Sequence, residues 1–183
     1  ILPSTADPRR MTLESNMETV INARWDAQHI LDGEQNVSIA ICGFGNIGAL
    51  LALSLQKQFG AHIHIIEADA WRREQAQALD FEVYGPEQNS MNYQLIFHTT
   101  CSESGLKWCF EHAAYEGTVI ELSWYVDKAV NIPLGEHFHY NRLKYLSSQV
   151  SNIPLHKPYE TYQSRKRLAV ELLSDDVYDR LFA

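Results

Sequence analysis

The sequence predicts an α/β fold: a doubly wound, parallel, six-stranded sheet with strand order 3-2-1-4-5-6 and helices on both faces. Three observations carry this prediction. Short apolar runs alternate with segments of helical periodicity along most of the chain. A glycine-rich turn joins the first apolar run to the first helix of the alternation. The alternation is interrupted after the third run, as expected for a sheet built from two βαβ halves. The runs are continuously apolar, as expected for parallel strands that are buried on both faces.

The expected elements follow from apolar runs, periodicity and turn residues. We expect strands at residues 37–42, 62–66, 81–84, 94–98, 118–122 and 143–147. Helices are expected between them at 46–59, 70–79 and 103–115. Before the first strand, residues 1–11 are expected to be irregular, and a helix over 13–31 is expected to begin at Thr12 as N-cap and to end at Asp32-Gly33. After the last strand we expect a turn-rich break at 152–158, a helix at 162–173 and a short helical piece at 175–181.

These elements divide the chain into three parts. Residues 1–34 form a lead-in segment and helix, 35–150 the domain that holds the sheet, and 151–183 a C-terminal helical segment.

Composition excludes several classes of protein. The chain has 183 residues, 45% of them hydrophobic and 21% charged, which is ordinary for a globular domain. A net charge of −8 argues against a nucleic-acid-binding surface. No apolar run approaches the roughly 20 residues that span a bilayer, and no signal peptide is visible. The three cysteines form no C-x-x-C pair, so we expect no structural zinc and a reduced, cytoplasmic setting.

The segment Gly43-Phe44-Gly45-Asn46-Ile47-Gly48 has the pattern G-x-G-x-x-G between a strand and a helix. In such a loop Gly43 permits a tight turn, Gly45 lets backbone approach a pyrophosphate, and Gly48 allows close packing of the helix on the sheet. The pyrophosphate would face the unpaired N–H groups at the helix N-terminus. An acid, Glu67, follows the second strand 19 residues after Gly48, where it can accept hydrogen bonds from ribose hydroxyls. The sequence therefore predicts a dinucleotide site, whereas an ordinary strand–turn–helix with incidental glycines is the alternative.

Further site residues follow from the rule that ligands bind beyond the carboxyl ends of the strands in such a sheet. Beside the loop, Glu67 and Arg72, this rule selects Thr99, Thr100, Leu122, Ser123, Ser147 and Ser148.

The choice between NAD and NADP depends on charge at the end of the second strand. Glu67 favours NAD, because a carboxylate repels a 2′-phosphate. NADP stays possible, because Arg72 and Arg73 follow closely and can meet a phosphate.

Three histidines are candidate site residues. His98 ends the fourth strand and could face the nicotinamide, but a hydrogen-bonded structural residue is the favoured interpretation. His137 and His139 could share a face of an extended segment and bind a metal. Because no third ligand is evident, we interpret them as surface histidines and expect no metal site.

The assembled motifs resemble the cofactor-binding, C-terminal domain of the medium-chain dehydrogenase/reductase superfamily, in its zinc-type alcohol dehydrogenase-like group. The resemblance covers roughly residues 12–183. The segments that carry it are METVINA before the first strand, CGFGNIG, GAHIHIIEADAWRR, YQLIFHTT, EGTVIELSWY and LSSQVS.

The resemblance implies the nicotinamide-dinucleotide-binding portion of an oxidoreductase that transfers hydride between NAD(P)(H) and an alcohol or carbonyl substrate. Family members carry zinc ligands and a proton relay in a separate N-terminal catalytic domain, and nothing in this chain matches that domain. We therefore expect a fragment or a chain without its catalytic half, and we assign no catalytic residue. The resemblance also suggests a homodimer through the edge of the sixth strand, where an uncovered edge invites pairing.

The sequence also allows two other functions to be compared with this one. A stand-alone, non-catalytic NAD(P)-binding module with a sensing or scaffolding role remains open. A methyltransferase is disfavoured, because Ile41 and Cys42 stand where that class has an acid just before the glycine loop.

Overall fold

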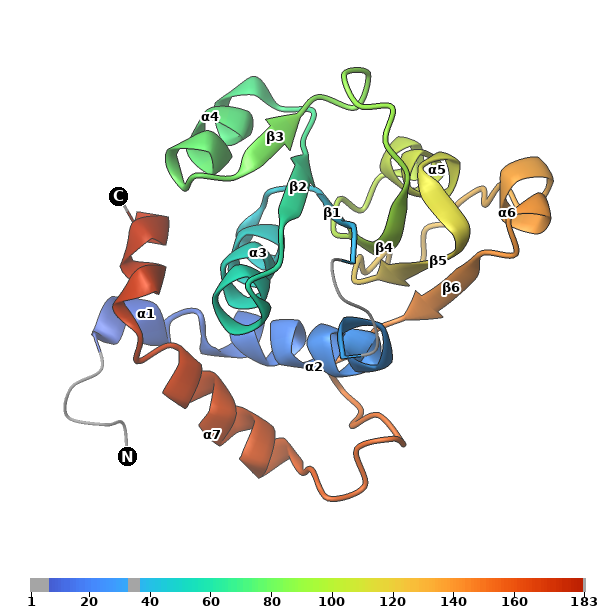
Figure 1. Ribbon diagram of the computed structural model, residues 1–183. Helices are drawn as coiled ribbons and strands as arrows, with labels where there is room; N and C mark the ends of the chain where they lie inside the picture. Colours follow the sequence, from blue (N-terminus) through green and yellow to red (C-terminus); the bar gives the residue numbers. More distant parts are fainter. Residues whose placement is uncertain (1–6, 33–36, 183) are drawn as a thin grey trace.

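The computed structural model describes residues 7–32 and 37–182, and its centre is one six-stranded sheet (Figure 1). All neighbouring strands are parallel and their order is β3-β2-β1-β4-β5-β6, which confirms the predicted fold class. The strands are β1 Ile39–Cys42, β2 Ile63–Ile66, β3 Glu82–Tyr84, β4 Tyr93–His98, β5 Ala113–Glu121 and β6 Lys144–Ser147. β6 lies at one edge of this sheet, as expected; the dimer that would use this edge stays a prediction.

Seven α-helices and a terminal 3₁₀ helix are present in the described part of the chain. They are α1 Pro8–Met11, α2 Glu14–Leu31, α3 Asn46–Phe59, α4 Ala70–Ala78, α5 Glu103–Glu111, α6 Glu136–Tyr140, α7 Tyr162–Leu172 and η1 Asp176–Phe182. Figure 1 shows α2 and α7, from opposite ends of the chain, side by side beneath α3. In the described ranges no helix is both long and apolar enough to cross a bilayer.

The core has two parts, one on each face of the sheet, because side chains of a strand alternate between faces. Ile39 and Ile41 of β1 point into the larger part, which contains apolar residues of α2, α3, α7 and η1. Ala40 and Cys42 point into the smaller part, which α5 covers with Leu106, Trp108, Cys109 and Phe110. α2 near the start of the chain and α7 and η1 at its end therefore pack into the same core as the sheet.

The start of the chain differs from the expectation. Residues 8–11 form a helical turn, α1, because the Asp7 side chain accepts from the Arg9 N–H and Pro8 occupies the first turn. Thr12 is therefore the C-cap of α1, with its hydroxyl donating to the Arg9 carbonyl, and the prediction of Thr12 as N-cap of the next helix is wrong. Gly33, expected at the end of that helix, lies outside the described residues.

The expected helix 103–115 ends earlier than predicted. α5 stops at Glu111, and β5 already begins at Ala113, which pairs with Tyr93. Between Ala113 and Thr118 the pairing register shifts, and Glu116 has a φ of 57°. A Cβ on Gly117 would lie 2.8 Å from the Ala114 carbonyl oxygen, so this sharp bend depends on glycine. Helical periodicity alone could not reveal a bend made by pairing with β4 and β6.

Candidate nucleotide site

Two of the three motif glycines are required by packing. Gly43 has a φ of +105°, and a Cβ there would lie 2.6 Å from Oγ1 of Thr99. A Cβ on Gly48 would lie 2.1 Å from the Gly43 carbonyl oxygen. Any side chain at either position would therefore push β1, the loop and α3 apart. These two contacts explain how the strand turns so tightly into α3.

Gly45 is different, because the fold does not require glycine there. Its φ of −85° and ψ of −170° suit any residue, and a Cβ would meet no atom within 4 Å. Gly45 is the N-cap of α3 and provides no side-chain cap. The N–H groups of the first turn, including those of Asn46, Ile47 and Gly48, have no partner within the helix. This open helix N-terminus is suited to an anion.

Glu67 lies beside the loop and is buried. One of its carboxylate oxygens accepts a hydrogen bond from the Phe44 N–H at 2.7 Å, and the other accepts from the Asp69 N–H at 2.9 Å. The carboxylate thus ties the end of β2 to the glycine loop. Each oxygen retains a second lone pair, so the predicted contact with ribose hydroxyls stays chemically possible.

The two arginines that follow Glu67 have different surroundings. Arg73 donates to the carbonyls of Glu67 and Ala68 at 2.9 and 2.6 Å, so its guanidinium holds the turn together. Arg72 is exposed, and its guanidinium makes no hydrogen bond or ion pair with any residue in the described ranges. It lines a cleft of about 680 Å³ between the loop and η1. The lining includes Phe44, Gly45, Asn46, Trp71, Arg180 and Phe182.

The remaining predicted residues also lie at the carboxyl edge of the sheet. Thr99 binds the carbonyl oxygens of Cys42 and Gly43 through its hydroxyl, and so fixes the exit of β1. Thr100 contacts His98, Leu122 packs at the edge of the larger core, and the Ser123 hydroxyl accepts from the Cys101 N–H. Ser147 is exposed, whereas Ser148 is buried and donates its N–H to the Glu121 carbonyl. The parallel register of β1, β4, β5 and β6 brings these residues to one edge.

A buried polar network lies among these strand ends and was missed by the sequence analysis. His98 is fully buried, and its Nδ1 lies 2.8 and 2.9 Å from the two carboxylate oxygens of Glu121. Its Nε2 lies 2.6 Å from the Thr100 hydroxyl. Glu121 also accepts from the Ser123 N–H and the Tyr145 hydroxyl at 2.7 and 2.9 Å. The interpretation of His98 as a hydrogen-bonded structural residue agrees with this arrangement.

The network shifts the acidity of its members. Burial by itself would raise the pKa of Glu121, but the hydrogen bond and charge of His98 and the hydrogen bonds from Ser123 outweigh burial and lower it. Burial, followed by the charge of Glu121, raises the pKa of Tyr145 well above its usual range. Glu121 is therefore ionised and Tyr145 is a neutral donor at neutral pH. One sequence signal could have found this network: an acid stands in the otherwise apolar run Val119–Leu122.

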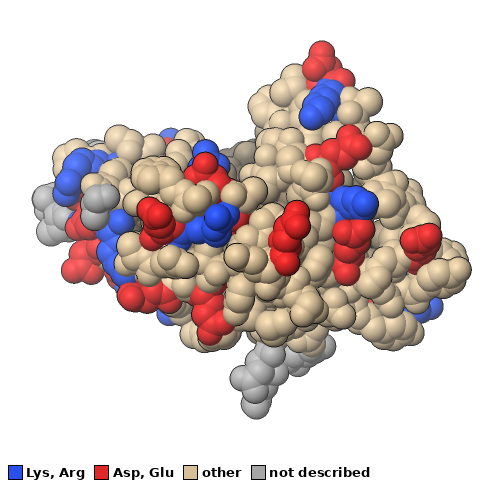
Figure 2. Space-filling model, turned by 90° about the horizontal axis from the view of Figure 1, so that it is seen from above, with Lys and Arg blue, Asp and Glu red and all other residues tan. Residues whose placement is uncertain are grey.

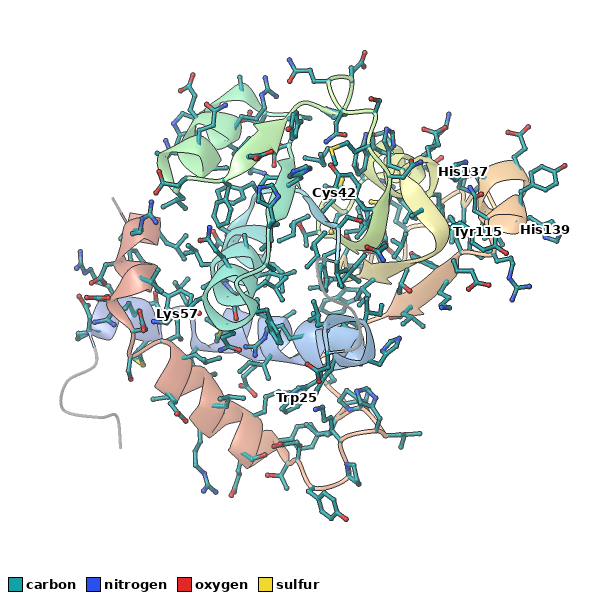
Figure 3. All side chains as sticks on the ribbon, in the orientation of Figure 1. Trp25, Cys42, Lys57, Tyr115, His137 and His139 are labelled. Atoms are coloured by element: carbon teal, nitrogen blue, oxygen red, sulfur yellow. The ribbon has the colours of Figure 1, made fainter. Side chains whose placement is uncertain are left out.

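His137 and His139 do not form the pair that an extended segment would give. They lie on α6, where residues two apart point in different directions, and His137 hydrogen-bonds the Ala113 carbonyl at 3.3 Å. Figure 3 shows both histidines at the α6 end of the molecule with Tyr115, away from Cys42 in the sheet.

Figure 2 shows acidic and basic side chains interspersed on the face seen from above. That face therefore has no continuous basic surface.

No family model matches the sequence, and no curated protein sequence matches it. Solved structures do match. L-idonate 5-dehydrogenase from Escherichia coli has a TM-score of 0.76 at 18% identity, covering 98% of this chain and 50% of that one. TarJ of S. aureus, in complex with NADPH, has a TM-score of 0.77 at 14% identity, covering 99% and 55%. A protein described as a short chain alcohol dehydrogenase from E. coli, complexed with NADH, has a TM-score of 0.73 at 14% identity, covering 96% and 50%.

These matches confirm the expected resemblance at the level of the fold. The chain shares the fold of the solved dehydrogenases that it matches and spans about half of their length. Identities of 14–18% establish the fold alone.

Proposed function

We propose that this chain binds a nicotinamide dinucleotide and forms the cofactor-binding part of a zinc-type, alcohol dehydrogenase-like oxidoreductase. Gly45 is the observation that carries the proposal. Packing and backbone conformation account for Gly43 and Gly48, but neither accounts for glycine at position 45. A ligand that approaches the backbone closely does account for it, and an anionic pyrophosphate suits the open N-terminus of α3.

Different residues of this chain would bind different parts of the cofactor. The glycine loop and the first turn of α3 would bind the pyrophosphate, and the cleft that contains Trp71 and Arg72 would hold the adenosine half. The ends of β4 and β5, with Thr99 and Ser123, would position the nicotinamide half. The bound cofactor supplies hydride chemistry. In this proposal residues 35–150 are the binding domain, residues 1–34 and 151–183 flank it, and a partner domain supplies zinc, the proton relay and most of the substrate pocket.

We expect NAD to be preferred over NADP. A buried carboxylate, Glu67, lies between the loop and the start of α4, where it disfavours a 2′-phosphate. Arg73 is bound to two carbonyl oxygens, which leaves Arg72 as the cation that would serve NADP. A preference for NADPH would therefore be traced to Arg72.

The test is a calorimetric titration of the chain with NADH and, separately, NADPH, repeated on Gly45→Val. We expect the variant to lose binding, because the branched side chain would occupy the space of the pyrophosphate, and to stay folded with a slightly lower unfolding temperature, because valine is a poorer N-cap than glycine. Gly135→Val is the matched control. Gly135 is also an N-cap glycine, with a φ of −81°, a ψ of −173° and no atom within 4 Å of a Cβ.

Binding by wild type and Gly135→Val but not by a folded Gly45→Val would support the proposal. Wild-type affinity in Gly45→Val would place the ligand elsewhere, and failure of the wild-type chain to bind either dinucleotide would contradict the proposed function of this chain.

A further inference from the structure

Three potential metal ligands converge at the opposite end of β2 from the glycine loop. Nε2 of His62 lies 3.0 Å from one carboxylate oxygen of Glu82, and Nε2 of His64 lies 3.1 Å from the other. One ligand atom from each residue can be chosen so that all three lie within 4.8 Å of one another. In the ranges 7–32 and 37–182 this is the one such group of three or more histidine, cysteine or carboxylate ligands.

The sheet places these residues together. His62 immediately precedes β2, His64 lies within it, and Glu82 begins β3 as the register partner of His64. His62 and His64 also line an open cleft of about 380 Å³ on this side of the molecule. The cluster is therefore held by two paired strands and is open to solvent, so an ion from solution can reach it.

The second nitrogen of His64 has a fixed partner. Its Nδ1 lies 2.7 Å from the hydroxyl of Tyr93, which accepts a hydrogen bond from the Asn89 side-chain amide at 2.5 Å. Histidine ligands of metals characteristically have such a partner, because it fixes the ring orientation and the tautomer. Tyr93 thus leaves Nε2 of His64, the nitrogen that faces Glu82, as the ligating atom.

The distances suit a tetrahedral ion. With bonds of 2.0–2.1 Å, two donors on a tetrahedral zinc ion are about 3.3 Å apart. Each imidazole now faces a different oxygen of Glu82, at 3.0 and 3.1 Å, and one ligand atom from each of the three residues lies within 4.8 Å of the others, so small side-chain rotations bring three donors to that separation. Two imidazoles and one carboxylate form a donor set that zinc accepts, and three protein ligands leave a fourth position for water.

We propose that His62, His64 and Glu82 form a site for a divalent transition-metal ion, with Zn²⁺ as the best match. The site joins β2 to β3, the strand at the sheet edge, and Tyr93 is its outer-shell support. It is independent of the nucleotide site, since no residue of the cluster belongs to the glycine loop or to the cleft beside α4.

The test is a titration of the metal-free, full chain with Zn²⁺ against a chromophoric chelator. We expect one ion to bind per chain. His62→Ala should weaken binding about 100-fold, because it removes a ligand, and Tyr93→Phe about 10-fold, because it removes the outer-shell partner. The His62 side chain is 72% exposed, so its loss does not threaten the fold. Co²⁺ in place of Zn²⁺ should give the visible absorption of a tetrahedral complex in the wild type and not in His62→Ala.

Two controls separate this site from other donors. The double variant His137→Ala/His139→Ala and the variant Cys101→Ser should bind Zn²⁺ as the wild type does, and His62→Ala should bind dinucleotide as the wild type does. Absence of Zn²⁺ binding in the wild type would overturn the proposal. Binding that is undiminished in His62→Ala, or that is lost in either control, would overturn it as well.

Discussion

Two histidine–carboxylate pairs bridge neighbouring strands of this sheet. His98 of β4 faces Glu121 of β5, and His64 of β2 faces Glu82 of β3; in each case the two residues are direct register partners. The first pair is almost completely buried, with exposures of 0% and 7%. In the second, His64 is buried as well, but the Glu82 side chain is 52% exposed. The same residue types at equivalent pairing positions thus occur in very different surroundings.

The surroundings decide what each pair can do. In the buried pair both nitrogens of His98 have protein partners, and Glu121 accepts further bonds from Ser123 and Tyr145. Because the donors of this network are already paired, the network fixes the ends of β4, β5 and β6 beside the proposed nicotinamide position. In the open pair Glu82 is shared by two imidazoles and can exchange those contacts for an ion. Burial therefore favours a structural role for the first pair and a ligand-binding role for the second.

The largest difference is expected between the losses of unfolding free energy that follow from removing Glu121 and from removing Glu82. Glu121→Ala would leave His98, the Ser123 N–H and the Tyr145 hydroxyl without a partner in a buried place, and should lower the free energy of unfolding by about 3–5 kcal/mol. Glu82→Ala removes an exposed acid that solvent screens, and should lower the free energy of unfolding far less in metal-free solution. Urea denaturation of the wild type and both variants measures the difference.

Equal losses in the two variants would break the comparison, because they would show that burial does not distinguish the pairs. A large loss of unfolding free energy in Glu82→Ala alone would reverse the roles assigned to the two pairs. Circular dichroism of each variant checks that the native fold is being compared.

The fold was predictable because its signals are local. Apolar runs and helical periodicity located the six strands and most helices, and G-x-G-x-x-G located the turn between β1 and α3. The bounds of α3 agree with the expected 46–59, because an N-terminal glycine and Gly60 in the left-handed region mark both ends. The short α6 was not expected, and β5 was expected to be much shorter. Both depend on contacts between segments that are distant in sequence.

The two histidine–carboxylate pairs could not be found from spacing alone. Glu121 is 23 residues from His98, and Glu82 is 18 residues from His64. Their meeting depends on which strands are neighbours and on the register between them. The pattern His62-x-His64 is as short as His137-x-His139, but the first lies at the start of a strand and the second on a helix. Only the strand geometry puts both imidazoles beside one acid.

The buried pair should also make stability depend on pH in the acidic range. The pKa of Glu121 is lower in the folded chain than its usual value, so the ionised form stabilises the fold above the unfolded pKa of about 4.3. That contribution is lost as the pH falls through the folded pKa. The difference in unfolding free energy between wild type and Glu121→Gln should shrink as the pH falls below about 4.

The exposed acid provides the reference for this measurement. The hydrogen bond from Tyr84, followed by the charges of His62 and His64, lowers the pKa of Glu82 as well, so wild type and Glu82→Gln should show a change of the same sign. Because solvent screens Glu82, that change should be smaller. A larger acid-dependent change for Glu82 than for Glu121 would contradict the assignment of the structural role to the buried pair.

The smallest expected effect comes from the tyrosines that donate to the two acids. Tyr145 donates to Glu121 at 2.9 Å while its ring packs on Phe110, and Tyr84 donates to Glu82 at 3.1 Å. Tyr145→Phe keeps the ring and removes one of three donors to a buried carboxylate, so it should lower the free energy of unfolding by about 1–2 kcal/mol. Tyr84→Phe should change it by less than about 0.5 kcal/mol, because water replaces the lost donor. Urea denaturation of both variants tests this prediction. Equal changes in the free energy of unfolding would mean that water reaches Glu121 more than its burial indicates.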